Sequence, residues 1–310
     1  MAPSIAQVLD NKAINGWNLF WLVTGPISAL MVVSMMRTDL SSGDAVSSMI
    51  QLSVRWAVPW LYLAFAASSV HVLFPGQFSR WLLRNRKYLG LCLAAAMAWQ
   101  ALFIVWLVTV YRDYYVGEVY VLRDVIEGVG GYLFLIAMTF TTFKFGRQLL
   151  KPKQWKLLHK SGIYFVWAYA FSVYWWAIFY YPSPVWIDYV FYWAGFLAWA
   201  LRAAAWSKKR RQLAARKTAT TRSQPAYLLM GVVLIGFGLV AASTGSAWWE
   251  PVEELVTGYA ITRVPELYLP YWPPLPFLPL FIIAAGAFLT TKTGVLKTAG
   301  TAEHPSAVPS

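Results

Sequence analysis

Long apolar runs separated by short polar turns cover most of the chain. Each run holds about twenty residues with almost no charge, which is the length that an α-helix needs to cross the hydrocarbon core of a bilayer. The pattern therefore predicts an all-α integral membrane protein with about eight transmembrane helices, six in a first bundle and two in a C-terminal addition. The predicted spans lie roughly at 16–36, 49–73, 88–110, 129–147, 161–181, 184–205, 226–243 and 273–291.

Composition points to the same class of protein. Of the 310 residues, 59% are hydrophobic and 13% are charged, whereas about a quarter of the residues in a typical soluble domain are charged. The formal net charge of +13 does not indicate a nucleic-acid surface, because the basic residues lie in short turns between apolar runs. With a single cysteine, Cys92, neither a disulfide within the chain nor a metal site built from cysteines is predicted.

Positive and negative charges alternate along the chain. The turns at 74–88, 144–160 and 202–222 are rich in lysine and arginine and contain no acid. The positive-inside rule places such turns in the cytoplasm, so we expect both termini to be cytoplasmic. The acidic residues gather in the loops between these turns, at Asp39, Asp44, Asp113, Glu118, Asp124, Glu127, Glu250, Glu253, Glu254 and Glu266.

The pattern also divides the chain into four segments. Residues 1–206 form the predicted six-helix bundle, and residues 207–224 form a basic, flexible cytoplasmic linker. Residues 225–300 hold the two added helices and the loop between them, and residues 301–310 form a tail that we expect to be disordered. The basic linker either sets orientation and touches anionic lipid, or it binds a partner, and both interpretations stay open.

The loop between the last two spans is outward-facing in this topology. Proline and acids at 250–256 predict a short helix there. The tryptophan and tyrosine side chains of the loop suit headgroup depth. The proline-rich stretch at 270–279 predicts extended chain leading into the last span. The loop is either a cap on the outer surface or a docking site for an outer partner.

Two histidines are candidates for redox chemistry. His71 ends the second predicted span and His159 opens the fifth, so both lie near the cytoplasmic face in the assigned orientation. Two imidazoles at one depth can hold a b-type haem. The other interpretation is a pair of interfacial histidines that bond to backbone or lipid phosphate.

Two short motifs match a known pattern. Residues 155–164 (WKLLHKSGIY) enter an apolar helix from a run of lysines, and residues 84–91 (RNRKYLGL) form a basic turn followed by Leu-Gly. Together they resemble, over about residues 50–205, the haem helices of the ferric-reductase-like transmembrane superfamily. That superfamily includes the haem subunit of the bacterial methionine sulfoxide reductase system. The resemblance implies a six-helix fold in a bacterial inner membrane, with a protein partner in the membrane or periplasm.

This chain departs from that superfamily at its central haem ligands. Gln100 and Ser172 stand where the superfamily places histidines, and neither an amide nor a hydroxyl is a usual ligand of haem iron. The resemblance thus implies the family fold with an emptied central haem position. Gln100 and Ser172 then form a helix–helix hydrogen bond, or they line a pocket for a quinone, lipid or pigment.

Arg55 and Asp188 are ionisable residues inside predicted spans, each near the outer end. A charge in the bilayer is unfavourable, and charged side chains there usually pair or mark a transport pathway. A single intramembrane acid makes a proton or ion pathway the weaker alternative. We therefore expect Arg55 and Asp188 to form an ion pair, direct or through water.

Two functions of different class follow from these observations. The chain contains no phosphate loop, nucleophile elbow or dinucleotide fingerprint, so it is not predicted to be a self-contained enzyme. The preferred hypothesis is a haem-free subunit that binds a partner protein or a lipid-soluble ligand such as a quinone. The alternative is a transmembrane electron-transfer subunit that binds b-type haem at His71 and His159.

Overall fold

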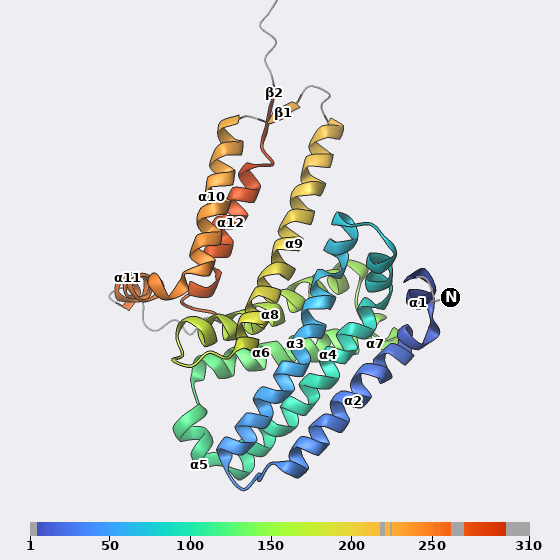
Figure 1. Ribbon diagram of the computed structural model, residues 1–310, viewed down its shortest axis with the longest axis vertical. Coiled ribbons are helices and arrows are strands. Elements are labelled where there is room, and N and C mark those ends of the chain that lie inside the picture. Colours follow the sequence, from blue (N-terminus) through green and yellow to red (C-terminus); the bar gives the residue numbers. More distant parts are fainter. Residues whose placement is uncertain (1–4, 218–220, 224, 262–269, 296–310) are drawn as a thin grey trace, which may run out of the picture. The chain divides into compact units, whose positions relative to one another are not determined.

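The computed structural model describes residues 5–217, 221–223, 225–261 and 270–295 of the chain (Figure 1). Its regular structure is helical except for two three-residue strands. Five helices are long and apolar enough to cross a membrane, so the chain has the features of an all-α membrane protein. These helices are α2 (Gly16–Arg37), α3 (Gly43–Leu73), α4 (Gln77–Val110), α8 (Pro152–Phe179) and α10 (Pro225–Ser243).

The other three predicted spans are helical but fall short of a span by length or composition. α6 (Leu122–Phe140) begins with three charged residues in its first two turns, and α12 (Leu278–Leu289) has only 12 residues. α9 (Trp186–Lys217) is long but rich in tryptophan and tyrosine and basic at its end. The expected helices therefore exist among the described residues, but only five of them have the length and hydropathy of a span.

Short elements connect the long helices. The N-terminal ones are α1 (Ile5–Asp10) and η1 (Lys12–Ile14), followed later by α5 (Arg112–Tyr114), η2 (Tyr115–Val119) and α7 (Lys144–Arg147). The C-terminal ones are β1 (Thr221–Ser223), η3 (Gly245–Ala247), α11 (Trp249–Ile261), η4 (Leu275–Phe277) and β2 (Thr293–Val295).

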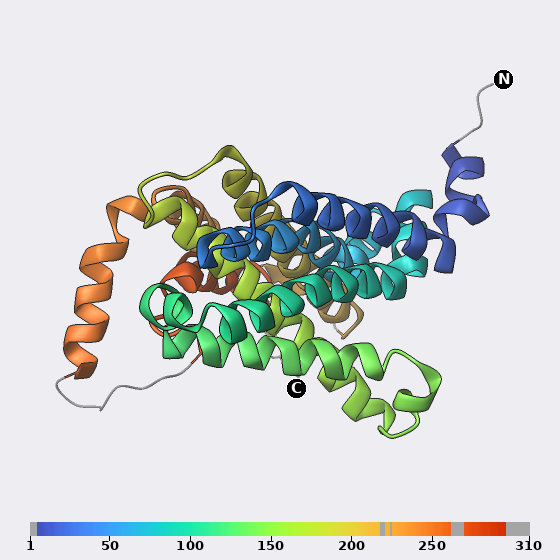
Figure 2. The same cartoon turned by 90° about the horizontal axis from the view of Figure 1, so that it is seen from below.

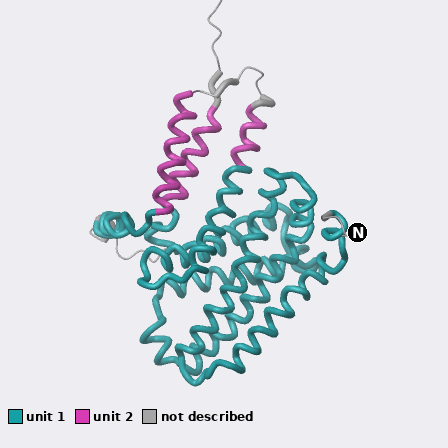
Figure 3. Tube along the Cα trace, in the orientation of Figure 1, with its two compact units in different colours: residues 1–205, 244–278 teal, residues 206–243, 279–310 magenta. Residues whose placement is uncertain are grey.

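The chain forms two compact units, which Figure 3 colours separately. The first unit contains residues 1–205 and 244–278, and the second contains residues 206–243 and 279–310. The sequence analysis assigned the whole of 225–300 to one C-terminal segment. The structure instead groups the loop between the last two helices with the first unit, because the loop packs on α8.

The predicted flexible linker is helical over most of its length. α9 continues without a break to Lys217, so the prediction of a flexible linker is wrong for residues 207–217. Alanine, leucine, glutamine, lysine and arginine dominate this stretch and are all strong helix formers. The predicted disordered tail at 301–310 lies outside the described residues.

The first unit is organised around α3 and α4. These helices follow one another through a short turn and pack side by side, and α2 packs on α4 (Figures 1 and 2). The end of this group nearest the turn between α2 and α3 has a core of six buried apolar side chains, Ile27, Met31, Val46, Met49, Phe103 and Leu107. Their burial gives these helices a fixed register, since closely packed side chains tolerate little displacement.

α6 and α8 form a second closely packed pair within the same unit. Gly130, near the middle of α6, lies against Phe165, near the middle of α8. Thr141, at the end of α6, contacts His159 in the first third of α8, so the two helices run antiparallel. Gly162 permits the close approach, because a Cβ atom there would lie 2.8 Å from the sulfur of Met138. The two ends of this pair hold the two cavities described below.

The second unit is built on close packing of α10 and α12. Each of Gly231 and Gly286 approaches the carbonyl oxygen of the other, and an added Cβ would lie 2.7 Å or 2.6 Å from that oxygen. Gly238 approaches the carbonyl of Pro279 in the same way. Small residues at such a contact are typical of helix pairs in membranes. β1 and β2 pair antiparallel, with Arg222 opposite Gly294.

The loop from η3 to η4 agrees with the sequence analysis in part. α11 confirms the short helix expected at 250–256. Trp248 packs on Trp175, and Trp249 packs on Trp176 of α8. The expected extended chain at 270–279 is wrong over its second half, where η4 and then α12 begin. Prolines are tolerated there because the first helical turn does not need their missing N–H groups.

Candidate functional site

The two histidines proposed as haem ligands have different partners. His71 Nδ1 lies 3.3 Å from the hydroxyl of Ser79, in the first turn of α4. His159 Nε2 lies 3.0 Å from the hydroxyl of Thr141 at the end of α6. The cavity lined by His159 does not include His71. Each histidine therefore has a side-chain hydroxyl as its neighbour, rather than the backbone or phosphate partner of the interfacial interpretation, and haem binding by the pair stays a prediction.

Gln100 and Ser172 are both buried, at 7% and 6% exposure, but they also have different partners. The Gln100 carbonyl accepts a hydrogen bond of 2.8 Å from the hydroxyl of Tyr132 on α6. The Ser172 hydroxyl donates to the carbonyl of Tyr169, one turn earlier in its own helix, at 2.9 Å. A helix–helix hydrogen bond thus exists for Gln100, with Tyr132 as its partner. The structure shows no hydrogen bond between Gln100 and Ser172, and the absence of a haem between them stays a prediction.

Arg55 and Asp188 form no direct salt bridge among the residues that the structure describes. Asp188 is buried, and its carboxylate accepts a hydrogen bond of 3.0 Å from the backbone N–H of Val185, the residue before α9. A carboxylate in the first turn of a helix commonly satisfies such an N–H. Helix capping therefore explains Asp188 without Arg55, and the water-mediated pair stays a prediction.

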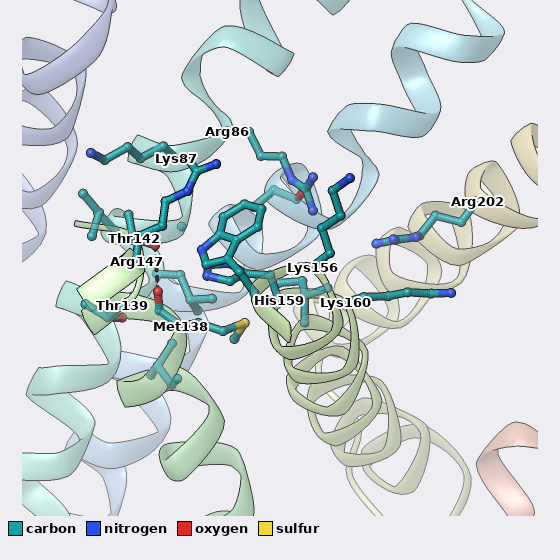
Figure 4. Close-up of a pocket in the computed structure, with 17 residues that line it drawn as sticks. Arg86, Lys87, Met138, Thr139, Thr142, Arg147, Lys156, His159, Lys160 and Arg202 are labelled. Carbon is teal, nitrogen blue, oxygen red and sulfur yellow. Dashed lines mark hydrogen bonds between the residues drawn. The ribbon is translucent and has the colours of Figure 1, made fainter. Parts of the chain in front are cut away.

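A cavity of about 480 Å³ lies where the end of α6 meets the start of α8 (Figure 4). Cationic side chains converge on it from four helices: Arg86 and Lys87 from α4, Arg147 from α7, Lys156 and Lys160 from α8, and Arg202 from α9. Among the residues that the structure describes, no carboxylate lines it. We call this site the basic cavity.

Hydrogen bonds to backbone carbonyl groups hold two of the arginines in place. Arg86 Nε donates to the carbonyl of Ala64 on α3, at 3.1 Å. Arg202 donates to the carbonyl of Phe65 at 3.1 Å, and its guanidinium lies 4.2 Å from the ring centre of Phe65 and 4.5 Å from that of Tyr164. Such stacking holds a guanidinium in place while leaving other N–H groups available.

A third arginine is positioned by an aromatic side chain. The guanidinium of Arg147 lies 4.9 Å from the ring centre of Trp155. Trp155 donates its indole N–H to the carbonyl of Thr141 at 3.0 Å, and its ring packs on His159 with centroids 4.3 Å apart. The three arginines of the basic cavity therefore sit on a framework of hydrogen bonds and ring contacts, which reduces the entropy lost when an anion binds.

Apart from Thr139, Thr142 and His159, the remaining lining of the basic cavity is mostly apolar. It includes leucine, isoleucine and methionine side chains from α4, α6 and α8, namely Leu91, Leu93, Leu135, Met138 and Ile163. Lys156 and Lys160 are exposed and make no described ion pair, so they can move toward a ligand. The arrangement suits a molecule with an anionic head and an apolar tail. Within the described residues, no group of His, Cys, Asp or Glu could hold a metal ion.

The sequence analysis used these cations only as a signal of orientation. It did not predict that they converge, because they belong to separate basic turns. The usable signal was the absence of any acid from the turns at 74–88 and 144–160, since cations with no acid nearby in the sequence are available to an anionic ligand. No protein-family model matches the chain, and no curated protein or solved structure matches it either.

Proposed function

We propose that the protein is a haem-free membrane subunit, similar in plan to the ferric-reductase-like superfamily, that binds an anionic phospholipid or a related anionic amphiphile in the basic cavity. The observation that carries this proposal is the lining: six cationic side chains, no carboxylate and an apolar floor. In a bacterial inner membrane with the basic turns in the cytoplasm, the cavity would face the anionic cytoplasmic leaflet.

The charge of the cavity favours an anion over a neutral quinone. Each lysine or arginine near an anionic membrane surface contributes about 1 kcal/mol to binding. A neutral quinone head would leave those cations unpaired, and it needs a few hydrogen-bond donors rather than six charges. The apolar floor in turn favours a lipid over a small soluble anion such as inorganic phosphate, because it would bury part of an acyl chain.

The redox alternative makes a separate prediction. A subunit that carried b-type haem at His71 and His159 would show a Soret band with reducible α and β bands after purification. The present proposal expects neither band. A haem spectrum that disappears in the His71→Ala and His159→Ala variants would support the redox alternative and contradict the haem-free assignment.

Lipid binding is tested by native mass spectrometry of the detergent-purified protein with added phosphatidylglycerol. We expect the Lys156→Gln/Lys160→Gln variant to bind this lipid about 30-fold more weakly, since each lost cation costs about 1 kcal/mol. The matched control is Lys151→Gln/Lys153→Gln, which makes the same charge change at the start of the same helix, on residues that do not line the cavity.

The outcomes separate a built site from general charge attraction. An equal loss in both double variants would contradict the proposal, because it would mean that any lysine near the surface suffices. Binding of phosphatidylcholine, whose head group carries no net charge, should be the same in wild type and in both double variants. Inorganic phosphate should fail to displace phosphatidylglycerol at millimolar concentration, and displacement would identify the ligand as a soluble anion instead.

A further inference from the structure

A second cavity, of about 360 Å³, lies at the opposite end of the α6–α8 pair. Its walls come from four separate segments of the first unit, one of which contributes only Glu253 of α11. Asp124 and Glu127 belong to the first turns of α6, Tyr169 and Trp176 to α8, and Tyr271 to the segment just before η4. In the topology predicted from the sequence, this end faces outward, away from the basic cavity. We call it the aromatic cavity.

The charge of the aromatic cavity is opposite to that of the basic cavity. Its lining holds three carboxylates, Asp124, Glu127 and Glu253, and one guanidinium, Arg123. That guanidinium is already engaged, since Arg123 lies 3.6 Å from Asp124 and donates to the carbonyl of Trp272. The cavity therefore has an excess of negative charge that the described side chains do not neutralise.

Glu127 is the most informative of these acids. It is only 7% exposed, and no described cation forms a salt bridge with it. One carboxylate oxygen accepts a hydrogen bond of 2.7 Å from the backbone N–H of Tyr271. A buried carboxylate is unfavourable without a positive partner. Burial raises the pKa of the Glu127 carboxyl, and a cation bound in the cavity would stabilise its charged form.

Tyr271 is held firmly beside Glu127. Its φ of 63° is unusual for a residue with a side chain and is supported by contacts on both sides. Its hydroxyl donates to the carbonyl of Phe165 at 2.8 Å, and its ring packs on Phe165 and Phe277. Burial, followed by the charge of Glu127, raises the pKa of the Tyr271 hydroxyl, so it remains a protonated donor. Glu127 thus faces a preformed wall.

Aromatic side chains make up most of the rest of the wall, which also contains Ser172, two valines and two prolines, and these rings favour a particular kind of cation. Tyrosine, tryptophan and phenylalanine rings attract organic cations through their electron-rich faces. A metal ion is not expected, because no suitable group of three ligands occurs among the described residues. The volume suits a small molecule. The rings that line the cavity are Tyr169, Trp176, Tyr180, Tyr181, Tyr271, Trp272 and Phe277.

We propose that the aromatic cavity binds a small organic cation of the alkylammonium or quaternary ammonium class, with Glu127 as its charge partner and the aromatic rings as its cage. Such a group occurs both in free solutes and in the head group of phosphatidylcholine. The site is independent of the basic cavity, because the two share no lining residue.

Calorimetry with choline, on the full chain in detergent, tests this proposal. We expect wild type to bind choline and Glu127→Gln to bind it at least about tenfold more weakly, because the variant loses the buried charge partner. Glutamine keeps an acceptor for the Tyr271 N–H, so the wall should remain folded. Glu254→Gln on α11 is the matched control, since Glu254 is exposed and does not line the cavity.

A neutral alcohol in which a tert-butyl group replaces the trimethylammonium group of choline controls for shape. It should not bind, and equal binding of the alcohol and choline would overturn the proposal. Protein in phosphatidylcholine nanodiscs, compared with phosphatidylglycerol nanodiscs, identifies a lipid source of the cation. If neither free choline nor phosphatidylcholine binds in a manner sensitive to Glu127→Gln, while a thermal scan shows that variant to be folded, the proposal is wrong.

Discussion

Gln100 shows how one tyrosine can satisfy a buried polar side chain. The Tyr132 hydroxyl reaches the Gln100 carbonyl from the neighbouring helix and lies 3.2 Å from the carbonyl of Met97. The amide is thereby held between α4 and α6 in an apolar setting, where an unmade hydrogen bond is unfavourable. Sequence reasoning identified Gln100 as buried and in need of a partner, but named Ser172. Tyr132 and Gln100 are 32 positions apart in the sequence, so no local signal indicates their contact.

Removing that hydroxyl should lower stability measurably. We expect Tyr132→Phe to cost about 1–2 kcal/mol, because the Gln100 carbonyl loses its partner in a buried position. Thermal unfolding in detergent, followed by tryptophan fluorescence, measures the effect. Tyr189→Phe, at a tyrosine that is 44% exposed, is the control and should leave the midpoint unchanged. Equal midpoints for the two variants would show that the Tyr132 bond contributes nothing.

At the scale of elements, the close packing of α10 against α12 requires glycine at certain positions, because any side chain there would collide with the backbone of the other helix. A Cβ at Gly238 would lie 2.9 Å from the carbonyl oxygen of Pro279 and 3.2 Å from the N atom of Ile283. Both atoms belong to backbone and cannot rotate away. Gly236, two residues earlier in the same helix, has no atom within 4 Å of the corresponding position.

We therefore expect the change from glycine to alanine to have different effects on stability at Gly238 and at Gly236. Gly238→Ala should destabilise the pair by about 1–3 kcal/mol through overpacking. Gly236→Ala should be neutral, or stabilise by up to about 1 kcal/mol through helix propensity. Thermal unfolding of the two variants in the same detergent measures both effects. If Gly238→Ala were as stable as Gly236→Ala, the close approach of the two helices would be refuted.

The positions of the helices could be predicted from the apolar runs in the sequence. Their first residues were harder to predict, since α4 begins at Gln77 and α8 at Pro152, each well before its apolar run. In both cases the helix already begins within the basic turn that precedes the apolar run, because lysine and arginine are good helix formers. The basic cavity depends on those extra turns, so a reading of apolar runs alone could not reveal it.

At the scale of the whole molecule, the main expectation is topology. We predict that the basic turns face the cytoplasm and the acidic loops face outward. An impermeant maleimide should label Glu118→Cys in intact cells and should label Lys153→Cys only after the membrane is opened. Both positions are exposed, and the native Cys92 is fully buried and should stay unlabelled. The reverse pattern would place the basic cavity on the outer side and contradict the proposed lipid contact.

The architecture of the whole could be predicted only in part. Charge alternation and apolar runs gave the class of protein, the approximate helices and the orientation to test. They could not show that the loop after α10 packs with the first unit, because that grouping depends on contacts such as Trp249 with Tyr180. Nor could they place Glu127 beside Tyr271, which are 144 residues apart. Long-range packing carries no periodic signal.

The length of α4 has a further consequence. Its 34 residues extend over about 51 Å, whereas the hydrocarbon core is about 30 Å thick. Arg86 and Lys87 lie ten and eleven residues into the helix, where the apolar run begins, so we expect them to lie at one boundary of that core. The run that follows exceeds the core slightly and must tilt, and a thinner bilayer would increase the tilt. The thickness of the surrounding membrane thus acts on the geometry of the basic cavity, and short-chain and long-chain lipids of identical charge should bind there differently.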